Sequence, residues 1–196
     1  MASTAFPNLL DVDWSQIPAP EDDGGARHLE GARIPDVALP ATDGSRVALA
    51  GLAGRVVVFA YPRTGQPGNP SPVADWDMIP GARGCTPQTC AFRDLHRDLA
   101  AAGAAAVFGL STQDTAYQKE AAERLHLPFP LLSDERLDLT TALRLPTMTV
   151  AGQTLLKRIA LVIDDGRIAK VFYPVFPPDR NAGDVLAWLQ AHPRKS

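Results

Sequence analysis

Cysteine is scarce in this sequence, with two residues in a chain of 196, and no apolar stretch is long enough to span a bilayer. Neither sign of charge dominates, because 19 basic and 22 acidic residues leave a net charge of -3. A chain without a basic stripe offers phosphates and anionic lipids no strong attraction. The sequence therefore argues against nucleic acid and membrane surfaces as partners.

Histidine is sparse as well, and the four histidines are scattered along the chain. They stand at His28, His96, His126 and His192. Two cysteines without a nearby pair of histidines provide too few ligands for closed zinc coordination. We expect no bound metal and no other cofactor, and we interpret each histidine as a solvated or capping residue.

The first residues, MASTAFP, lack the cationic and apolar regions of a signal peptide. We therefore expect a cytoplasmic protein. Structural disulfides are rare in that reducing compartment, and a domain of this size does not depend on one. The two cysteines fit a catalytic pair better than a structural bridge.

Apolar side chains make up 45% of the chain, which is enough for one substantial core. Residues 1–30 differ from the rest, since they mix acidic residues, glycine and proline with only two short apolar clusters. We interpret them as an N-terminal extension, an arm that docks through Leu9, Leu10 and Trp14. Residues 31–196 are expected to form a single domain.

Strands and helices alternate along this domain, which indicates an α/β sheet fold. The β-branched run at 55–61 predicts a strand with both faces covered. A hairpin is expected at 34–49 around Asp43-Gly44. Further strands are expected at 105–110, 129–132, 155–163 and 167–173, and helices at 86–102, 115–125, 137–143 and 183–192.

Both cysteines follow a segment, residues 65–84, whose many prolines and glycines predict a long loop. They stand at Cys85 and Cys90, where this loop gives way to a helix. The first turn of a helix has unpaired N–H groups and the positive end of the helix dipole, and both favour thiolate over thiol. We expect Cys85 to be the nucleophile, because Cys90 is more than a turn further along.

A disulfide between the two cysteines is incompatible with an intact helix. An ideal helix places Cα atoms five residues apart at about 8.7 Å, whereas a disulfide needs less than about 7 Å. Pairing Cys85 with Cys90 would therefore require the helix start to unwind, and the bond would be strained and readily reduced. The alternative for Cys90 is a plain core position beside Ala91 and Phe92.

Several motifs follow one another in a specific order. They are Tyr61-Pro62, Gly84-Cys85-Thr86, Cys90 and Phe92-Arg93-Asp94, followed by PFPLLSD at 128–134 and RIALVID at 158–164. In this order they resemble a peroxiredoxin of the Q type, the group of the bacterioferritin comigratory protein. The resemblance extends from about residue 31 to the C-terminus.

This resemblance implies a thioredoxin-like fold, with a central mixed β-sheet flanked by helices, and a peroxidase that reduces hydrogen peroxide and organic hydroperoxides. It also implies that the Cys85 thiolate attacks the peroxide, that the resulting sulfenic acid condenses with Cys90, and that a thioredoxin-type dithiol reduces the disulfide. Arg158 matches the family's active-site arginine, where a fixed cation stabilises the thiolate and polarises the peroxide. Its alternative is a surface arginine on a strand. Relatives of this type occur as monomers and as homodimers, and we expect one of these two states.

The chain departs from the family pattern before the nucleophile. The family's threonine three residues before the cysteine is Ala82 here, and alignment from the upstream Tyr-Pro pair places Gln66 in that position. This alignment implies an insertion over residues 69–83. We expect Thr64 or Gln66 to supply the missing hydrogen bond, and we expect both, with Pro62, to bind substrate.

The inserted segment brings Trp76, Asp77 and Met78 close to the nucleophile in sequence. We hypothesise that it covers the pocket as a lid and restricts which peroxide or reductant enters. A second departure is Gln88, where many relatives carry glutamate. This change removes a charge but keeps a hydrogen-bond acceptor.

Two other functions fit parts of the sequence. A thiol–disulfide oxidoreductase of the same fold usually has two residues between its cysteines, and it would leave Arg158 without an evident role. A redox-responsive binding or sensor protein with weakened peroxidase activity is favoured by the missing threonine. Continuous consumption of peroxide in the presence of a reductant distinguishes a peroxidase from such a sensor.

Overall fold

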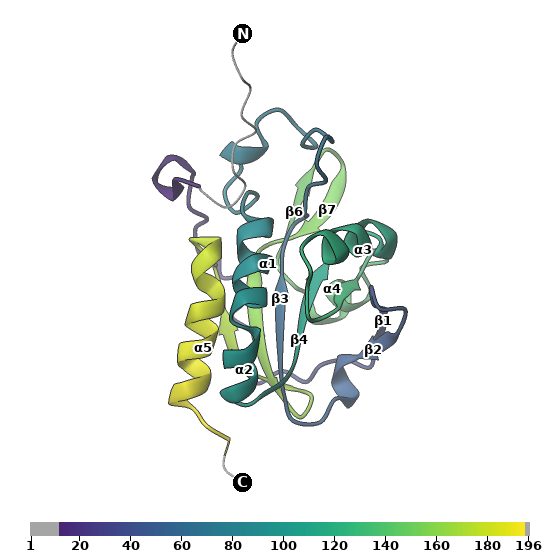
Figure 1. Ribbon diagram of the computed structural model, residues 1–196, viewed down its shortest axis with the longest axis vertical. Coiled ribbons are helices and arrows are strands. Elements are labelled where there is room, and N and C mark those ends of the chain that lie inside the picture. The colour runs from purple at the N-terminus through teal and green to yellow at the C-terminus, as the bar shows by residue number, and fades with distance from the viewer. Residues whose placement is uncertain (1–11, 195–196) are drawn as a thin grey trace.

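The computed structural model describes residues 12–194, and a five-stranded sheet lies at its centre (Figure 1). β3 (Arg55–Ala60) pairs in parallel with β4 (Ala104–Ser111), which pairs in parallel with β5 (Leu131–Ser133). On its other side β3 pairs antiparallel with β8 (Ile159–Asp164), which pairs antiparallel with β9 (Arg167–Phe172). The sheet is therefore mixed, with β3 in the middle.

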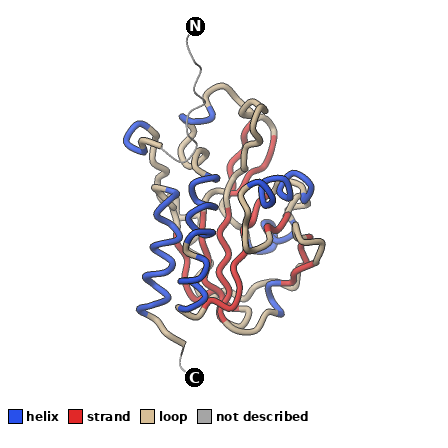
Figure 2. The backbone as a smooth tube through the Cα atoms, in the orientation of Figure 1, coloured by secondary structure: helices blue, strands red, loops and turns tan. Residues whose placement is uncertain are grey.

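Helices cover both faces of this sheet (Figure 2). α1 (Cys85–Asp94), α2 (His96–Ala101) and α5 (Asn181–Ala191) lie on one face. α4 (Asp138–Leu143) packs on the opposite face, and α3 (Thr115–Arg124) contacts β5. The expected α/β fold is confirmed, and the predicted bounds of α3, α4 and α5 are correct to within two residues.

The residues of β3 alternate between two cores. Val56 and Val58 belong to the core on the α4 side, whereas Val57 and Phe59 belong to the core under α1 and α5. All of β3 is buried, which confirms the prediction that both faces of this strand are covered. Phe59 stacks on Phe92 of α1 with ring centroids 4.1 Å apart, so α1 is anchored directly on the central strand.

The expected N-terminal hairpin is present as β1 (Ala38–Pro40) and β2 (Arg46–Ala48). The two strands pair antiparallel, and Gly44 in their turn has a φ of 86°, which glycine adopts without strain. Ala41, which follows β1, forms a bridge with Leu132 of β5. The hairpin therefore closes the core at the β5 edge of the sheet.

The helix predicted at 86–102 is divided into α1 and α2. The division falls at Leu95, whose φ of -93° and ψ of 6° lie outside the helical range. Phe92 and Leu99 are both fully buried on either side of it. Apolar spacing continues through the bend, and for this reason the periodicity did not reveal it.

The strand predicted at 155–163 is wrong in its first part. Residues there belong to β7 (Gln153–Leu156), which pairs with β6 (Thr147–Val150) in a separate hairpin. In the turn of this hairpin, Ala151 and Gly152 have φ angles of 49° and 75°. The sequence Ala-Gly is not one of the Asn-Gly or Asp-Gly pairs that usually identify a two-residue hairpin turn, so the turn was not predicted. The chain leaves β7 and enters β8 through two residues, one of which is Arg158.

The N-terminal segment packs onto the domain. Ala26 and Leu29, which precede the predicted domain start at 31, are buried in the core on the α4 side. The domain boundary at 31 stays a prediction. Trp14 donates its indole N–H to Asp179 at 2.9 Å and meets the ring of Phe176 edge to face. The predicted docking of Leu9 and Leu10 lies outside the described residues.

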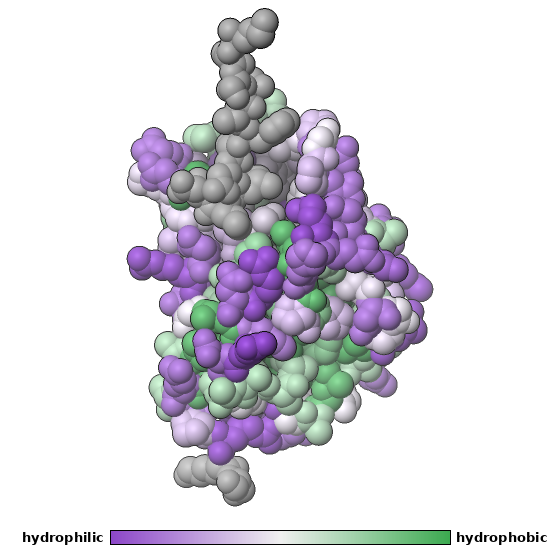
Figure 3. Space-filling view, viewed as in Figure 1, coloured by the Kyte–Doolittle hydropathy of each residue, from purple (hydrophilic) through white to green (hydrophobic). Residues whose placement is uncertain are grey.

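The surface seen in Figure 3 mixes hydrophilic and apolar side chains. Among residues 12–194, Met78 is the single large apolar side chain that is exposed, at 59%. None of the helices in that range combines the length and the apolar content that a bilayer crossing requires.

Candidate active site

Helix α1 begins at Cys85 because the residue before it is glycine. Gly84 has a φ of 106°, and a Cβ atom built on it would lie 2.5 Å from Pro178 Cγ and 2.8 Å from Trp14 Cη2. A side chain there would be strained by the backbone and would also clash with both neighbours. The close packing places Cys85 in the first turn, where backbone N–H groups have no partner within the helix.

The sulfur of Cys85 lies beside a guanidinium group. Its Sγ is 3.4 Å from Nη2 of Arg158 and 3.7 Å from the carbonyl oxygen of Ala82. The cysteine is 4% exposed and Arg158 is 2% exposed, so little water separates the two groups. The guanidinium can only donate, so at this distance it offers an N–H to the sulfur.

Arg158 hydrogen-bonds the end of the inserted segment as well as helix α1. Its Nη2 also donates to the carbonyl oxygens of Gly81, Ala82 and Arg83, at 3.2, 3.3 and 3.0 Å, and its Nη1 donates to Oε1 of Gln88 at 2.5 Å. Its Nε is buried and has no hydrogen-bond partner in the described part of the chain. Because Arg158 is buried, the alternative of a surface arginine is wrong.

Gln88 links Arg158 to a residue further from the sulfur, Asn181. Its Oε1 accepts from Arg158, as expected for a residue that keeps the acceptor of glutamate, and its Nε2 donates to Oδ1 of Asn181 at 2.9 Å. Gln88 is fully buried and Asn181 is 1% exposed. No local motif pointed to Asn181, which lies 93 positions from Gln88 in the sequence.

A cavity of about 290 Å³ lies beside Cys85. The inserted segment contributes Trp76 and Asp77 to its lining, and Asp77 forms an ion pair with Arg83. Trp76 is 8% exposed and packs against the β6–β7 hairpin. The insertion thus lines the cavity beside Cys85, whereas its role as a lid stays a prediction.

The three predicted substrate-binding residues have other partners. The backbone N–H of Thr64 donates to Gln113 Oε1 at 2.8 Å, and Oε1 of Gln66 accepts from Asn69 at 2.8 Å. Between residues 12 and 194 neither side chain hydrogen-bonds the Cys85 sulfur, so neither replaces the family's threonine there. Pro62 accepts from Ser111 through its carbonyl at 3.2 Å. Binding of substrate by these residues stays a prediction.

Cys90 is also a free, buried thiol, further along α1. Burial raises the pKa of its thiol, and the positive charge of Arg93 opposes that effect only in part. Cys90 is therefore held as a neutral thiol in this conformation. Among the described residues, the contact with the Arg158 guanidinium is made by Cys85 and not by Cys90.

Tyr61 follows β3 directly and is buried in the same core cluster as Cys85. Its hydroxyl donates to Oε1 of Gln118 at 2.8 Å. Burial raises the pKa of Tyr61 well above the usual value, and the negative charge of Cys85 raises it further. Tyr61 therefore stays neutral and adds no competing charge to the site.

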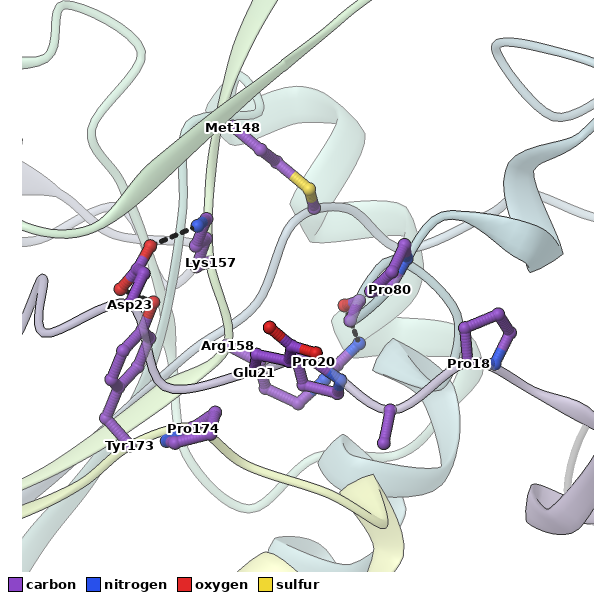
Figure 4. Close-up of a pocket in the computed structure, with 12 residues that line it drawn as sticks. Pro18, Pro20, Glu21, Asp23, Pro80, Met148, Lys157, Arg158, Tyr173 and Pro174 are labelled. Carbon is purple, nitrogen blue, oxygen red and sulfur yellow. Dashed lines mark hydrogen bonds and ion pairs between the residues drawn. The ribbon is translucent and has the colours of Figure 1, made fainter.

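Arg158 also lines a second pocket, of about 510 Å³, under the N-terminal segment (Figure 4). In that view Arg158 extends past Pro20 and Glu21, and Asp23 joins Lys157. The Asp23 carboxylate accepts from Lys157 Nζ at 2.6 Å and from the Tyr173 hydroxyl at 2.8 Å. In the part of the chain that is described, no cluster of three or more His, Cys, Asp or Glu side chains is placed to hold a metal ion.

Comparison with known proteins gives a consistent result. A family model described as Redoxin matches residues 29–186. The chain is 34% identical over 164 residues to a peroxiredoxin Q, chloroplastic, from Oryza sativa subsp. japonica, covering 83% of this chain and 67% of that protein. It is 34% identical over 163 residues to peroxiredoxin Bcp from Escherichia coli (strain K12), covering 81% of this chain and 93% of that protein.

A solved structure agrees with these sequence matches. The crystal structure of peroxidoxin BcpB from Mycobacterium tuberculosis has a TM-score of 0.68 and 29% identity, and the similarity covers 86% of this chain and all of that one. Its overall path matches the mixed sheet and flanking helices described above. The chain belongs to the peroxiredoxin family, beside peroxiredoxin Q and Bcp, and is a thiol peroxidase with a thioredoxin-like fold.

Proposed function

We propose that this peroxidase uses Cys85 as its nucleophile, Arg158 as the cation that stabilises the reacting charge, and Cys90 as the resolving cysteine. The observation that carries the proposal is the buried contact of 3.4 Å between Cys85 Sγ and Arg158 Nη2. A thiolate in the first turn of a helix and a buried guanidinium are the groups that an attack on a peroxide requires.

In the first step, the Cys85 thiolate attacks the terminal oxygen of the peroxide. An S–O bond forms, the O–O bond breaks, and the leaving alkoxide or hydroxide takes a proton from solvent. The sulfur is oxidised to a sulfenic acid by two electrons, and the peroxide is reduced to an alcohol or water. Negative charge moves from sulfur to the leaving oxygen during this step, and Nη2 of Arg158, which lies 3.4 Å from the sulfur, is the donor nearest to the developing charge.

In the second step, the sulfur of Cys90 displaces the hydroxyl of the Cys85 sulfenic acid, giving a disulfide and water. Both cysteines are buried, and they are five residues apart on one helix, so the first turn of α1 has to open before their sulfurs can meet. A thioredoxin-type dithiol then reduces the disulfide through a mixed disulfide, which restores both thiols.

The range of substrates and the setting are proposals too. We expect hydrogen peroxide and organic hydroperoxides as substrates, since the cavity beside Cys85 combines Trp76 with the charged pair of Asp77 and Arg83. Cytoplasmic location and a monomeric or homodimeric state stay predictions. The plant relatives carry the word chloroplastic in their names.

Rapid-mixing measurements test the proposal. Tryptophan fluorescence after mixing with hydrogen peroxide, followed by thiol counting after one equivalent, should show fast loss of both thiols. Cys85→Ser should abolish the reaction, whereas Cys90→Ser should permit the first oxidation but stop turnover with a dithiol protein. Oxidation of Cys85 no faster than a free thiol would contradict the assignment.

A sensor role is the second candidate, because Ala82 provides no hydroxyl where the family has threonine. Its backbone carbonyl, not a side chain, lies next to the sulfur. Turnover separates the two functions, since a sensor is oxidised once by each equivalent of peroxide whereas a peroxidase continues as long as reductant is supplied.

A further inference from the structure

Three buried polar side chains form a chain of hydrogen bonds from the nucleophile to the start of α5. Arg158 Nη1 donates to Gln88 Oε1 at 2.5 Å, and Gln88 Nε2 donates to Asn181 Oδ1 at 2.9 Å. The three residues are between 0 and 2% exposed. Such a chain is isolated from water, so each member has to be satisfied by the next one.

The chemistry of the first member fixes the orientation of the others. A guanidinium group can only donate, so the Gln88 amide must turn its oxygen toward Arg158. Its NH₂ group then faces Asn181, which must accept through its carbonyl oxygen. Without an acceptor at position 181, the NH₂ group of Gln88 would be a buried donor without a partner. The hydrogen bond that stabilises this orientation of the amide would then be lost.

The backbone around Asn181 is well supported. Asn181 is the first residue of α5 and follows a 3-10 turn that begins at Pro178, the residue packed against Gly84. α5 in turn packs along α1, so both ends of the Gln88–Asn181 bond are carried by contacting helices. In the described part of the chain, Gln88 is the single hydrogen-bond partner of the Asn181 side chain.

We propose that Asn181 is a positioning residue of the peroxidase site, which orients the Gln88 amide so that Arg158 is held against the Cys85 sulfur. This inference rests on the proposed roles of Cys85 and Arg158. Asn181 touches neither the sulfur nor the peroxide. It acts through Gln88 and Arg158, and it links the geometry of the nucleophile to the packing of α5.

The test compares Asn181→Leu, which has no acceptor, with Asn181→Asp, which keeps one. For each, the rate of the first oxidation by hydrogen peroxide is measured across pH in a Cys90→Ser background. Asn181→Leu should lower the rate at neutral pH by about tenfold and move the midpoint of the pH profile upward by up to about one unit, the size of one buried hydrogen bond. Asn181→Asp should stay within about threefold, because the first turn of α5 tolerates a carboxylate.

A matched control separates positioning from packing. Val185→Ala removes a buried side chain of α5 that is outside the hydrogen-bonded chain, and it should lower the unfolding midpoint while leaving the pH profile in place. A pH profile of Asn181→Leu that superimposes on that of the unsubstituted chain would overturn the inference, as would an equal shift in Val185→Ala.

A double-substitution cycle tests the route of the effect. In a Gln88→Leu background, Asn181→Leu should produce no further shift, because the intermediate amide is absent. A shift that persists at full size would mean that Asn181 acts by another route. If Cys85→Ser fails to abolish peroxide consumption, it is the proposed function that fails, whereas normal dependence on Cys85 with an inert Asn181→Leu rejects this inference alone.

Discussion

Both terminal nitrogens of the Arg158 guanidinium have contacts with neighbouring groups. Two of its nitrogens make one contact with sulfur, one with an amide oxygen and three with backbone carbonyls. A lysine in the same place would supply one nitrogen, and could reach only part of this set. The planar shape of the group therefore matters as much as its charge.

Arg158→Lys is expected to retain the fold and lose most of the activity. The second-order rate of peroxide reduction should fall by about 10²-fold, because the donors that meet the developing charge are displaced. Stopped-flow oxidation of the reduced protein measures this rate, with circular dichroism to verify the fold. A rate within about threefold of the original would show that charge alone is sufficient at this position.

At the scale of the elements, the start of α1 depends on Gly84, which lies between α1, the turn before α5 and the N-terminal segment. Gly84 touches Pro178 before α5 and Trp14 of the N-terminal segment, in addition to its own helix. Cys85, the proposed nucleophile, is therefore positioned by contacts between elements that are far apart in the sequence. A change at Gly84 should affect all of them together.

Gly84→Ala is expected to destabilise the protein by about 3 kcal/mol, from a strained φ together with a steric clash. Gly44→Ala is the matched control, because Gly44 also has a positive φ, of 86°, but has nothing within 4 Å of an added Cβ. The control should cost only about 1 kcal/mol, from backbone strain alone. Denaturant unfolding measures both, and equal losses would show that the contacts with Pro178 and Trp14 contribute nothing.

At the scale of the whole molecule, Asp23 joins the N-terminal segment to parts of the chain more than 130 positions away. Hydrogen bonds from Lys157, the Gly25 N–H and Tyr173 hold the pKa of Asp23 well below its usual range. A lowered folded-state pKa means that this carboxylate stabilises the fold above its ordinary value of about 4, and that the stabilisation is lost as pH falls through the lowered value.

Asp23→Asn should accordingly reduce stability at pH 7 and have a smaller effect near pH 3. Because the pair is partly exposed to solvent, with side chains 33% and 45% accessible, the loss should be modest and should shrink in salt. Unfolding midpoints at the two pH values measure it, with Lys157→Met as the reciprocal variant. The same loss at both pH values would show that the charge of Asp23 is not involved.

The sequence was sufficient for those features whose signals are local. The β-branched run of β3 predicted a buried strand, and the end of the proline-rich loop predicted the helix start near Cys85. Arg158 was reached only through the resemblance to the peroxiredoxin family, and the fold places it against Cys85. Asn181 had no such signal, since its partner is distant in sequence and its surroundings look like any helix start. Thr64 or Gln66 was expected to supply the hydrogen bond of the family's threonine, from the alignment that starts at the Tyr-Pro pair, but Thr64 hydrogen-bonds Gln113, from the loop after β4.

The placement of Arg158 also determines what oxidation does to the protein. In the proposed mechanism Cys85 reacts as a thiolate, which would place a negative charge in contact with Arg158, and both residues are almost completely buried. The disulfide proposed between Cys85 and Cys90 would carry no charge, so its formation would leave the Arg158 cation in the interior without a counter-ion, and such a group is costly to bury. In the proposed cycle the reduced form would therefore have the better-neutralised interior, and the buried Arg158 would favour release of the disulfide by reduction.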